Sequence, residues 1–160
     1  MPDGIVNELI GEILKVDREN NKDIDCNGVI HSIVGDFTYE NGKDKINQMT
    51  GGGHSQANID FLQKNGIAVT VINKFNNGVR VGNVSIHRDK DKETNYGQAW
   101  FPANWKYDDI IKAGKYVISI NRANVKEGAY LYGKYNGVRV LVIISKGKIG
   151  TIAPDKNSQP

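Results

Sequence analysis

Two glycine turns divide the C-terminal third of the chain into three strand-like runs. Asn136-Gly137 and Lys146-Gly147 each separate segments that are rich in β-branched and aromatic residues. A two-residue connection of this kind joins antiparallel neighbours, because the chain reverses without a crossover. The sequence therefore predicts an antiparallel sheet built from residues 129–135, 138–145 and 148–153.

A second hairpin is predicted in the middle of the chain. Residues 67–75 and 79–86 are rich in β-branched side chains, and Asn77-Gly78 between them is typical of a type I′ turn. The charged segment 87–92 follows the second of these runs. We expect two paired strands here and then a basic loop.

Apolar residues at helical spacing predict helices on either side of this hairpin. The first spans residues 5–16, and the second opens at His54 or Ser55 and ends at Asn65-Gly66. A third carries Ile110, Ile111, Ala113 and Val117 on one face. The run 29–37 fits either a buried strand or a turn of helix around His31. Helices first and hairpins later favour an α+β fold.

Composition narrows the classes of protein that this chain fits. Its 160 residues suit one domain, and no apolar run approaches the roughly 20 residues that span a bilayer. Residues 1–4 lack the features of a signal peptide, and we expect no membrane contact. A net charge of +3 permits a polyanionic partner without demanding one. The single cysteine, Cys26, excludes an internal disulfide, and the histidines match no zinc pattern.

Two of the three histidines are candidates for chemistry. His54 directly follows three glycines, which supply no wall against which to bury a ring; the alternative is an incidental histidine in a flexible loop. His31 lies in an apolar run, where an ordinary core histidine is the alternative. His87 opens the charged loop, and we expect it at the surface.

Backbone and ammonium groups near these histidines are candidates for binding an anion. The glycines can adopt positive φ and let backbone N–H groups, that of Gly53 included, approach a ligand closely. Lys90 and Lys92 lie in the basic loop, where the alternative is two solvated side chains.

Two imidazoles and an ammonium can supply the acid, the base and the positive charge that metal-free RNA cleavage uses. A base removes the proton of the 2′-OH, and an acid protonates the departing 5′-oxygen. Imidazole can do either at neutral pH if the two rings hold opposite protonation states. An ammonium or a backbone N–H stabilises the charge that develops on the phosphate oxygens. We therefore take His31 and His54 as a candidate acid/base pair.

Several segments together carry a family resemblance. They are HSIVGDF at 31–37, GGGHSQANIDFL at 51–62, NGVRVGNV at 77–84, and GQAWFP at 97–102 with Trp105 following. As a set they resemble the EndoU endoribonucleases, in particular the bacterial EndoU domains at the C-termini of polymorphic and contact-dependent inhibition toxins. The first segment is similar to a His-x3-Gly-Asp-Phe motif of viral members.

The resemblance implies an EndoU-like fold, of the kind grouped with RNase A and barnase, with N-terminal helices and antiparallel sheets. It covers most of the chain, from about residue 29 to 154. We accordingly expect an N-terminal helix and linker over 1–25, a nuclease domain over 26–154, and a flexible tail over 155–160.

The resemblance also implies roles for individual residues. His54 corresponds to the histidine that acts as general base, and His31 to the one that acts as acid. Lys92, which lies 38 residues after His54, matches the family lysine better than Lys90, which we keep as a substrate contact. Thr151 matches the threonine that lines the uridine pocket.

Two positions depart from the family pattern. Ala153 stands where an aromatic ring stacks on the base, and Ala99 stands where a hydroxyl residue precedes Trp-Phe-Pro. Losing a stacking ring removes about 1–3 kcal/mol of nucleotide binding. Either the preference for uridine is lost, or another aromatic ring, such as that of Tyr96, stacks on the base instead.

The resemblance implies a metal-independent endoribonuclease that leaves 2′,3′-cyclic phosphate and 5′-OH ends. No cofactor is expected to be required, although manganese stimulates some relatives. The toxin context implies that the domain is secreted or delivered into the cytoplasm of a target cell. It also implies RNA, with tRNA foremost, as the substrate, and a cognate immunity protein as a partner. We expect a monomer.

Two other classes of function remain open. Ala99 and Ala153 are compatible with a catalytically silent module that binds RNA or protein on the same fold. A metal-dependent DNase that uses His54, His87 and acidic neighbours is the second. Cleavage that survives a chelator distinguishes the metal-independent reaction from this DNase.

Overall fold

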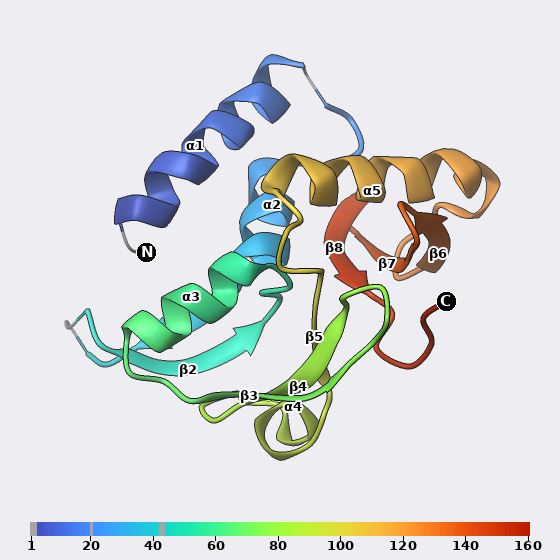
Figure 1. The fold of residues 1–160 in the computed structure, drawn as a ribbon. Coiled ribbons are helices and arrows are strands. Elements are labelled where there is room, and N and C mark those ends of the chain that lie inside the picture. The colour runs from blue at the N-terminus through green and yellow to red at the C-terminus, as the bar shows by residue number, and fades with distance from the viewer. Residues whose placement is uncertain (1–2, 20, 42–43) are drawn as a thin grey trace.

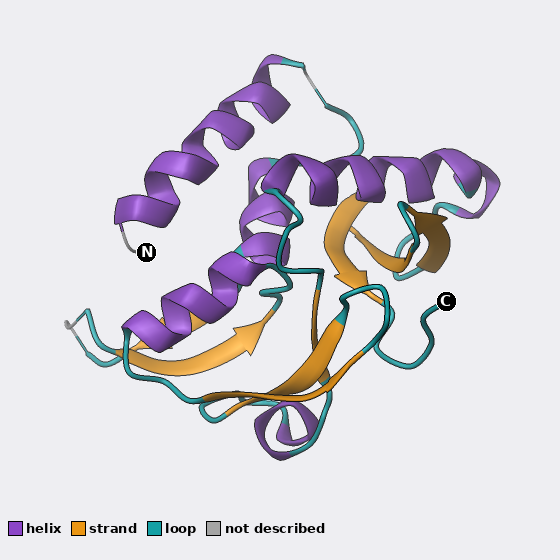
Figure 2. Ribbon diagram, viewed as in Figure 1, coloured by secondary structure: helices purple, strands orange, loops and turns teal. Residues whose placement is uncertain are grey.

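Two helices open the chain, helices and strands are then interspersed, and three consecutive strands end it (Figures 1 and 2). The structure is a computed structural model that describes residues 3–19, 21–41 and 44–160. Its elements are α1 (Asp3–Arg18), α2 (Cys26–Ile33), β1 (Asp36–Tyr39), β2 (Ile46–Gly51), α3 (Gln56–Lys64), β3 (Val69–Lys74), β4 (Arg80–Val84), α4 (Lys90–Thr94), β5 (Gln98–Trp100), α5 (Tyr107–Ile120), the 3-10 turn η1 (Arg122–Asn124), β6 (Tyr130–Tyr135), β7 (Val138–Ser145) and β8 (Lys148–Pro154). None of the helices described combines the length and apolar character that crossing a membrane requires.

The strands form three small antiparallel sheets, β1-β2, β3-β4-β5 and β6-β7-β8. This arrangement confirms the predicted α+β class. The run 29–37, for which two structures were open, is divided between α2 and β1. The predicted basic loop contains the short helix α4, because Asp89 caps it by accepting a hydrogen bond from the Asp91 N–H.

The three predicted hairpin turns do not all have the expected type. Asn136-Gly137 and Lys146-Gly147 hold positive φ at both residues, which is the type I′ geometry and suits the twist of the strands. At Asn77-Gly78 only the glycine has positive φ, at 95°. Phe75 and Val79 close a three-residue loop there through the Phe75 N–H and the Val79 carbonyl. The type I′ prediction is therefore wrong at this turn.

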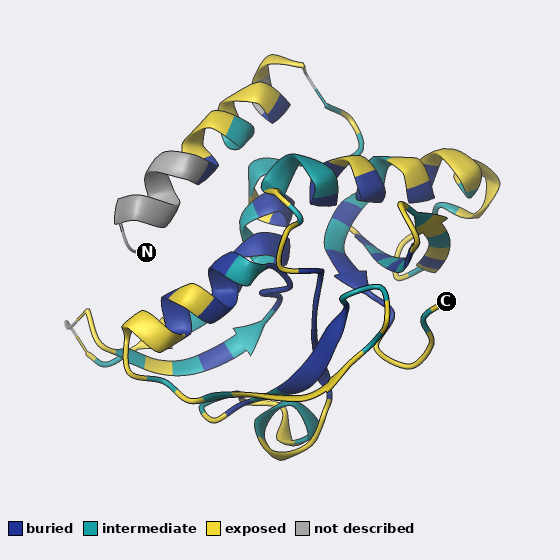
Figure 3. Ribbon diagram, viewed as in Figure 1, coloured by how far each residue is buried: buried dark blue, intermediate teal, exposed yellow. Residues whose placement is uncertain are grey.

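The buried apolar residues form two separate cores. The larger core lies between the helices α1, α2 and α5 and the sheet β6-β7-β8, whose middle strand buries every second residue (Figures 1 and 3). The smaller core packs α3 against β2, β4 and β5 through Met49, Ile59, Leu62, Val84 and Trp100.

Residues of α1 and of the segment after β8 pack on the rest of the molecule. On α1, Leu9 and Val16 are buried in the larger core, so this helix shares its core with the domain that follows. The segment 155–160, which was predicted to be a flexible tail, makes specific contacts with β7 through Arg139. Asp155 is buried and accepts a hydrogen bond of 2.7 Å from Arg139 Nε, and Gln159 donates to the carbonyl oxygens of both residues.

Candidate active site

The C-terminal end of α2 is hydrogen-bonded to the segment 53–58, which begins at the last of the three glycines. The last carbonyls of a helix have no partner inside it. Here four consecutive carbonyl oxygens, of residues 31–34, each accept one hydrogen bond from this segment. The donors in order are the N–H of Gly53 (2.8 Å), the N–H of His54 (2.7 Å), the hydroxyl of Ser55 (2.7 Å) and the amide of Asn58 (2.8 Å). This pairing brings His31 and His54 together although they are 23 residues apart.

The glycines are needed for this close approach. Gly52 and Gly53 have φ of +65° and +72°, and a Cβ on Gly52 would lie 1.9 Å from the His31 carbonyl oxygen. The Gly53 N–H, which was predicted to contact the substrate, donates in this structure to the His31 carbonyl oxygen. The Gly53 carbonyl accepts from Gln98, whose side-chain amide also donates to Gly52. Gly53 therefore holds the loop in place.

His54 is buried and held in one tautomer. Its Nδ1 lies 2.8 Å from the carbonyl oxygen of Ala99, which can only accept, so Nδ1 carries the proton. The pKa of His54 is lowered to about 3, chiefly by burial; the charge of Lys92 contributes to this shift, and the bond to Ala99 opposes it. At neutral pH the ring is therefore neutral, with its lone pair on Nε2.

His31 has a hydrogen-bond acceptor at each ring nitrogen. Nδ1 lies 2.6 Å from Asp36 Oδ2, and Nε2 lies 3.0 Å from the hydroxyl oxygen of Thr151. A protonated ring can donate to both oxygens at once. Thr151 is fixed in turn because the N–H of Ile152, its neighbour on β8, donates to Ser32 on α2.

Lys92 extends from α4 without a carboxylate within 4.0 Å of its Nζ among the residues described. Burial lowers the pKa of its ammonium; Asp89 opposes the shift, and Lys156 adds to it. Lys156 belongs to the segment that was predicted to be a loose tail. Two ammonium groups therefore lie on this side of the site.

His31, His54, Lys92 and Thr151 line one open cavity of about 430 Å³. We call it the histidine cavity. One wall is the outer face of the C-terminal sheet, where two rows of cross-strand neighbours run from β6 to β8. The rows are Tyr130–Ile143–Thr151 and Tyr132–Leu141–Ala153. The cavity thus combines two imidazoles and an ammonium with two tyrosine side chains.

A family model described as bacterial EndoU nuclease matches residues 26–156. The chain belongs to the bacterial EndoU nuclease family. The match begins at α2 and ends at Lys156, so it includes all the residues named above in the histidine cavity. Searches of curated proteins and of solved structures gave no significant match. Membership makes the chain a nuclease by family and agrees with the resemblance seen in its motifs.

Of the four predicted substrate contacts, Thr151 lines the histidine cavity, whereas Gly53, Lys90 and Tyr96 do not. Lys90 is exposed and forms an ion pair of 3.3 Å with Glu93, one turn further along α4. Tyr96 is 59% exposed and does not line the cavity. Tyr130 and Tyr132 were not predicted as site residues. The sequence could have indicated them. Residues two apart on the predicted strand 129–135 share one face of the sheet, and the predicted site residue Thr151 lies two strands away in that sheet.

His87 of the EndoU domain is buried, contrary to the expectation of a surface residue. Its Nδ1 accepts a hydrogen bond of 2.9 Å from the Asp89 N–H, while Nε2 is buried without a partner. Burial lowers the pKa of His87 to about 4, and the charge of Lys92 adds to this effect. Across residues 3–19, 21–41 and 44–160, no three His, Cys, Asp or Glu side chains gather so that they could hold a metal ion.

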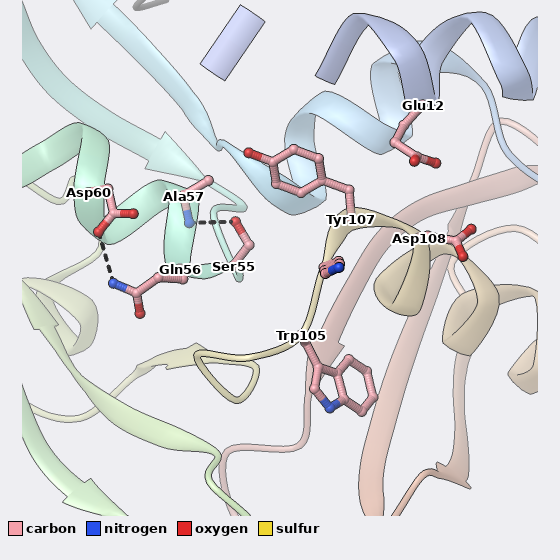
Figure 4. Close-up of a pocket in the computed structure, with 9 residues that line it drawn as sticks. Glu12, Ser55, Gln56, Ala57, Asp60, Trp105, Tyr107 and Asp108 are labelled. Carbon is pink, nitrogen blue, oxygen red and sulfur yellow. Dashed lines mark hydrogen bonds between the residues drawn. The ribbon is translucent and has the colours of Figure 1, made fainter. Parts of the chain in front are cut away.

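A cavity of about 440 Å³ lies elsewhere in the molecule, where α1, α3 and α5 meet (Figure 4). Glu12, Asp60 and Asp108 contribute carboxylates to its lining, and Asp60 accepts a hydrogen bond from Gln56. It contains neither of the candidate catalytic histidines. Its acidic lining is unsuited to a nucleic-acid backbone, so the histidine cavity is the better candidate for the active site.

Proposed function

We propose that this chain is an endoribonuclease that cleaves RNA by attack of the 2′-OH on the adjacent phosphodiester. One observation carries the proposal. Two imidazoles and an ammonium line the same cavity, and each imidazole has its Nδ1 fixed by an acceptor, Ala99 for His54 and Asp36 for His31. In this proposal the Nε2 atom of each ring transfers a proton, and that of His31 lies 3.0 Å from the hydroxyl oxygen of Thr151.

The proposed reaction assigns one proton transfer to each ring. His54 Nε2 takes the proton of the 2′-OH as that oxygen bonds to phosphorus. The bond from phosphorus to the 5′-oxygen breaks, and His31 Nε2 gives its proton to this oxygen. The Lys92 ammonium stabilises the charge on the nonbridging oxygens. The products are a 2′,3′-cyclic phosphate and a 5′-OH.

The departure at Ala99 is compatible with this reaction, because the group that orients His54 is the backbone carbonyl of that residue. For the missing ring at Ala153 we propose Tyr130 and Tyr132 as the platform for the base. Tyr132 lies in the same cross-strand row as Ala153, and both tyrosines line the histidine cavity. An aromatic face of this kind stacks on any base.

The biological setting is proposed from the family resemblance. We propose a toxin domain that is delivered into the cytoplasm of a target cell, acts there as a monomer on tRNA or another RNA, and is blocked by an immunity protein. We further propose that it needs no cofactor, with manganese as a stimulant.

Single substitutions of the three proposed catalytic residues test the reaction. His31→Ala, His54→Ala and Lys92→Ala should each lower the rate of tRNA cleavage in the presence of EDTA by roughly 10²-fold or more. Lys90→Ala is the matched control from the same helix and should keep the wild-type rate. Full activity of His54→Ala would show that His54 is not the general base.

The same assay separates the other two functions. Binding of tRNA with no cleavage by the wild type would favour the silent module. Cleavage of DNA that EDTA abolishes would favour a metal-dependent DNase.

A further inference from the structure

Another cavity, distinct from the one in Figure 4, adjoins the histidine cavity at His31. It has a volume of about 330 Å³ and lies between the first turn of α2 and the turn that connects β7 to β8. His31 lines both cavities, and its partner Asp36 lines this one as well. We call it the lysine cavity, because Lys146 and Lys148 are the cations in its lining.

The backbone turn before Lys148 is fixed, and the ammonium groups of Lys146 and Lys148 are available to an anion. In the part of the chain that the structure describes, neither ammonium lies within 4.0 Å of a carboxylate. The turn that carries them is fixed because the Glu127 carboxylate accepts hydrogen bonds from the N–H groups of Lys146 and Gly147. The carboxylates in the same lining are engaged, Asp25 with the Gly28 N–H and Asp36 with His31.

The direction of the proposed reaction indicates which side of the cleaved bond this cavity faces. In an in-line displacement the attacking and leaving oxygens lie on opposite sides of phosphorus. The base His54 therefore marks the side of the 2′-OH, and the acid His31 marks the side of the leaving 5′-oxygen. The nucleotide 3′ of the cleaved bond continues beyond His31, and the lysine cavity is on that side.

We propose that the lysine cavity binds the nucleotide on the 3′ side of the cleaved bond, and that Lys146 and Lys148 contact the phosphate at its 3′ end. This inference rests on the proposed function of the histidine cavity. The ligand class is a phosphomonoester or phosphodiester of an RNA chain. Such contacts place the scissile bond in register and add a salt-dependent share of the affinity.

The test compares substrates that differ by one phosphate. The probes are the four dinucleotides NpA, with N each of the four nucleosides, and the same dinucleotides with a 3′-phosphate. The wild type should show a kcat/KM roughly tenfold higher for the phosphorylated member of the best pair, as expected for one or two charge-assisted hydrogen bonds at an exposed site. In the double variant Lys146→Asn/Lys148→Gln this preference should disappear, while the rate on the plain dinucleotide stays unchanged.

Asparagine is chosen at position 146 because it tolerates the positive φ of 55° found there. Lys64→Gln, at the exposed C-terminal end of α3, is the matched control and should keep the preference. Equal kcat/KM values for the two members of every pair, or a preference that survives the double variant, would overturn this inference alone. A wild type that cleaves none of the eight probes and no tRNA would overturn the proposed function and this inference with it.

Discussion

The protonation states of two rings decide whether the histidine cavity can cleave RNA. His54 is neutral over a wide range of pH, because burial lowers its pKa to about 3. Deprotonation makes a general base competent, so acid removes its activity only near that pKa. His31 has acceptors at both nitrogens, which suits a ring that starts the reaction with two protons.

The first prediction concerns the acid side of the pH profile. For the wild type, kcat/KM reports the pKa of groups in the free enzyme. We expect the limb that belongs to His54 to lie well below pH 6.5, toward about 3. Initial rates on a dinucleotide between pH about 3 and 7 measure it. A rate already halved near pH 6.5 by protonation of the base would contradict the buried, neutral His54.

The second prediction concerns Asp36, a positioning residue for His31. Asp36→Asn should lower kcat on RNA by roughly 10²-fold or more, because an amide does not fix the ring as the carboxylate does. A nucleoside 3′-(p-nitrophenyl phosphate) provides the control, since nitrophenolate leaves without an acid. On this substrate the variant should approach the wild-type rate. An equal loss on both substrates would show that Asp36 acts on something other than the acid.

At the scale of the elements, the junction between α2 and the glycine segment places the site. Sequence motifs identified His31, His54 and the glycines, but the use of the Gly53 N–H could not be read from them. That N–H binds the end of a helix more than 20 residues away, and only the tertiary pairing reveals it. In the same way, Tyr130 and Tyr132 reach the cavity through strand register, which is absent from any one segment.

The third prediction tests the junction. Gly52→Ala should lower the free energy of unfolding by about 3 kcal/mol or more, because its Cβ would overlap the His31 carbonyl. Gly66→Ala is the control, with a similar φ of +73° and nothing within 4 Å of the added Cβ. It should cost about 1 kcal/mol, from backbone strain alone. Urea denaturation measures both, and equal losses would show that the close approach does not matter.

The fourth prediction tests the outer face of β6 as a base platform. Tyr130→Ala and Tyr132→Ala should each raise KM for RNA, by an amount equivalent to about 1–3 kcal/mol for a ring that stacks on a base. Tyr96→Ala should leave KM unchanged, since Tyr96 lies outside the histidine cavity. Steady-state kinetics on a dinucleotide compares the three. A larger effect from Tyr96 would restore the platform expected from the sequence.

For the whole molecule, the sequence predicted the fold class better than the contacts of its ends and loops. Local signals were sufficient for the strands of the C-terminal sheet, because Asn136-Gly137 and Lys146-Gly147 specify their turns. They were insufficient for His87 and Asp155, which lie in polar segments and are buried by distant parts of the chain. Polar sequence indicates a loop, but it does not indicate what covers that loop.

The fifth prediction follows from the two buried, neutral histidines. The pKa values of His54 and His87 are about 3 and about 4 in the folded chain, against 6.5 for a solvated imidazole. Between these values the unfolded chain binds more protons than the folded one, so the free energy of unfolding falls as pH falls. The loss begins near pH 6.5 and is complete below the folded pKa values. Urea denaturation should show a shallower loss for His87→Asn, and an unchanged slope would contradict a neutral His87.

The chemistry of the newly formed RNA ends tests the central claim most directly. The account holds that imidazoles move the protons of a transesterification between the 2′-OH and the 5′-oxygen. Mass spectrometry of tRNA fragments formed in EDTA should therefore find 2′,3′-cyclic phosphate and 5′-OH ends with the wild type, and none with His54→Ala. Fragments that carry 3′-OH and 5′-phosphate ends, or identical fragments from both proteins, would contradict it.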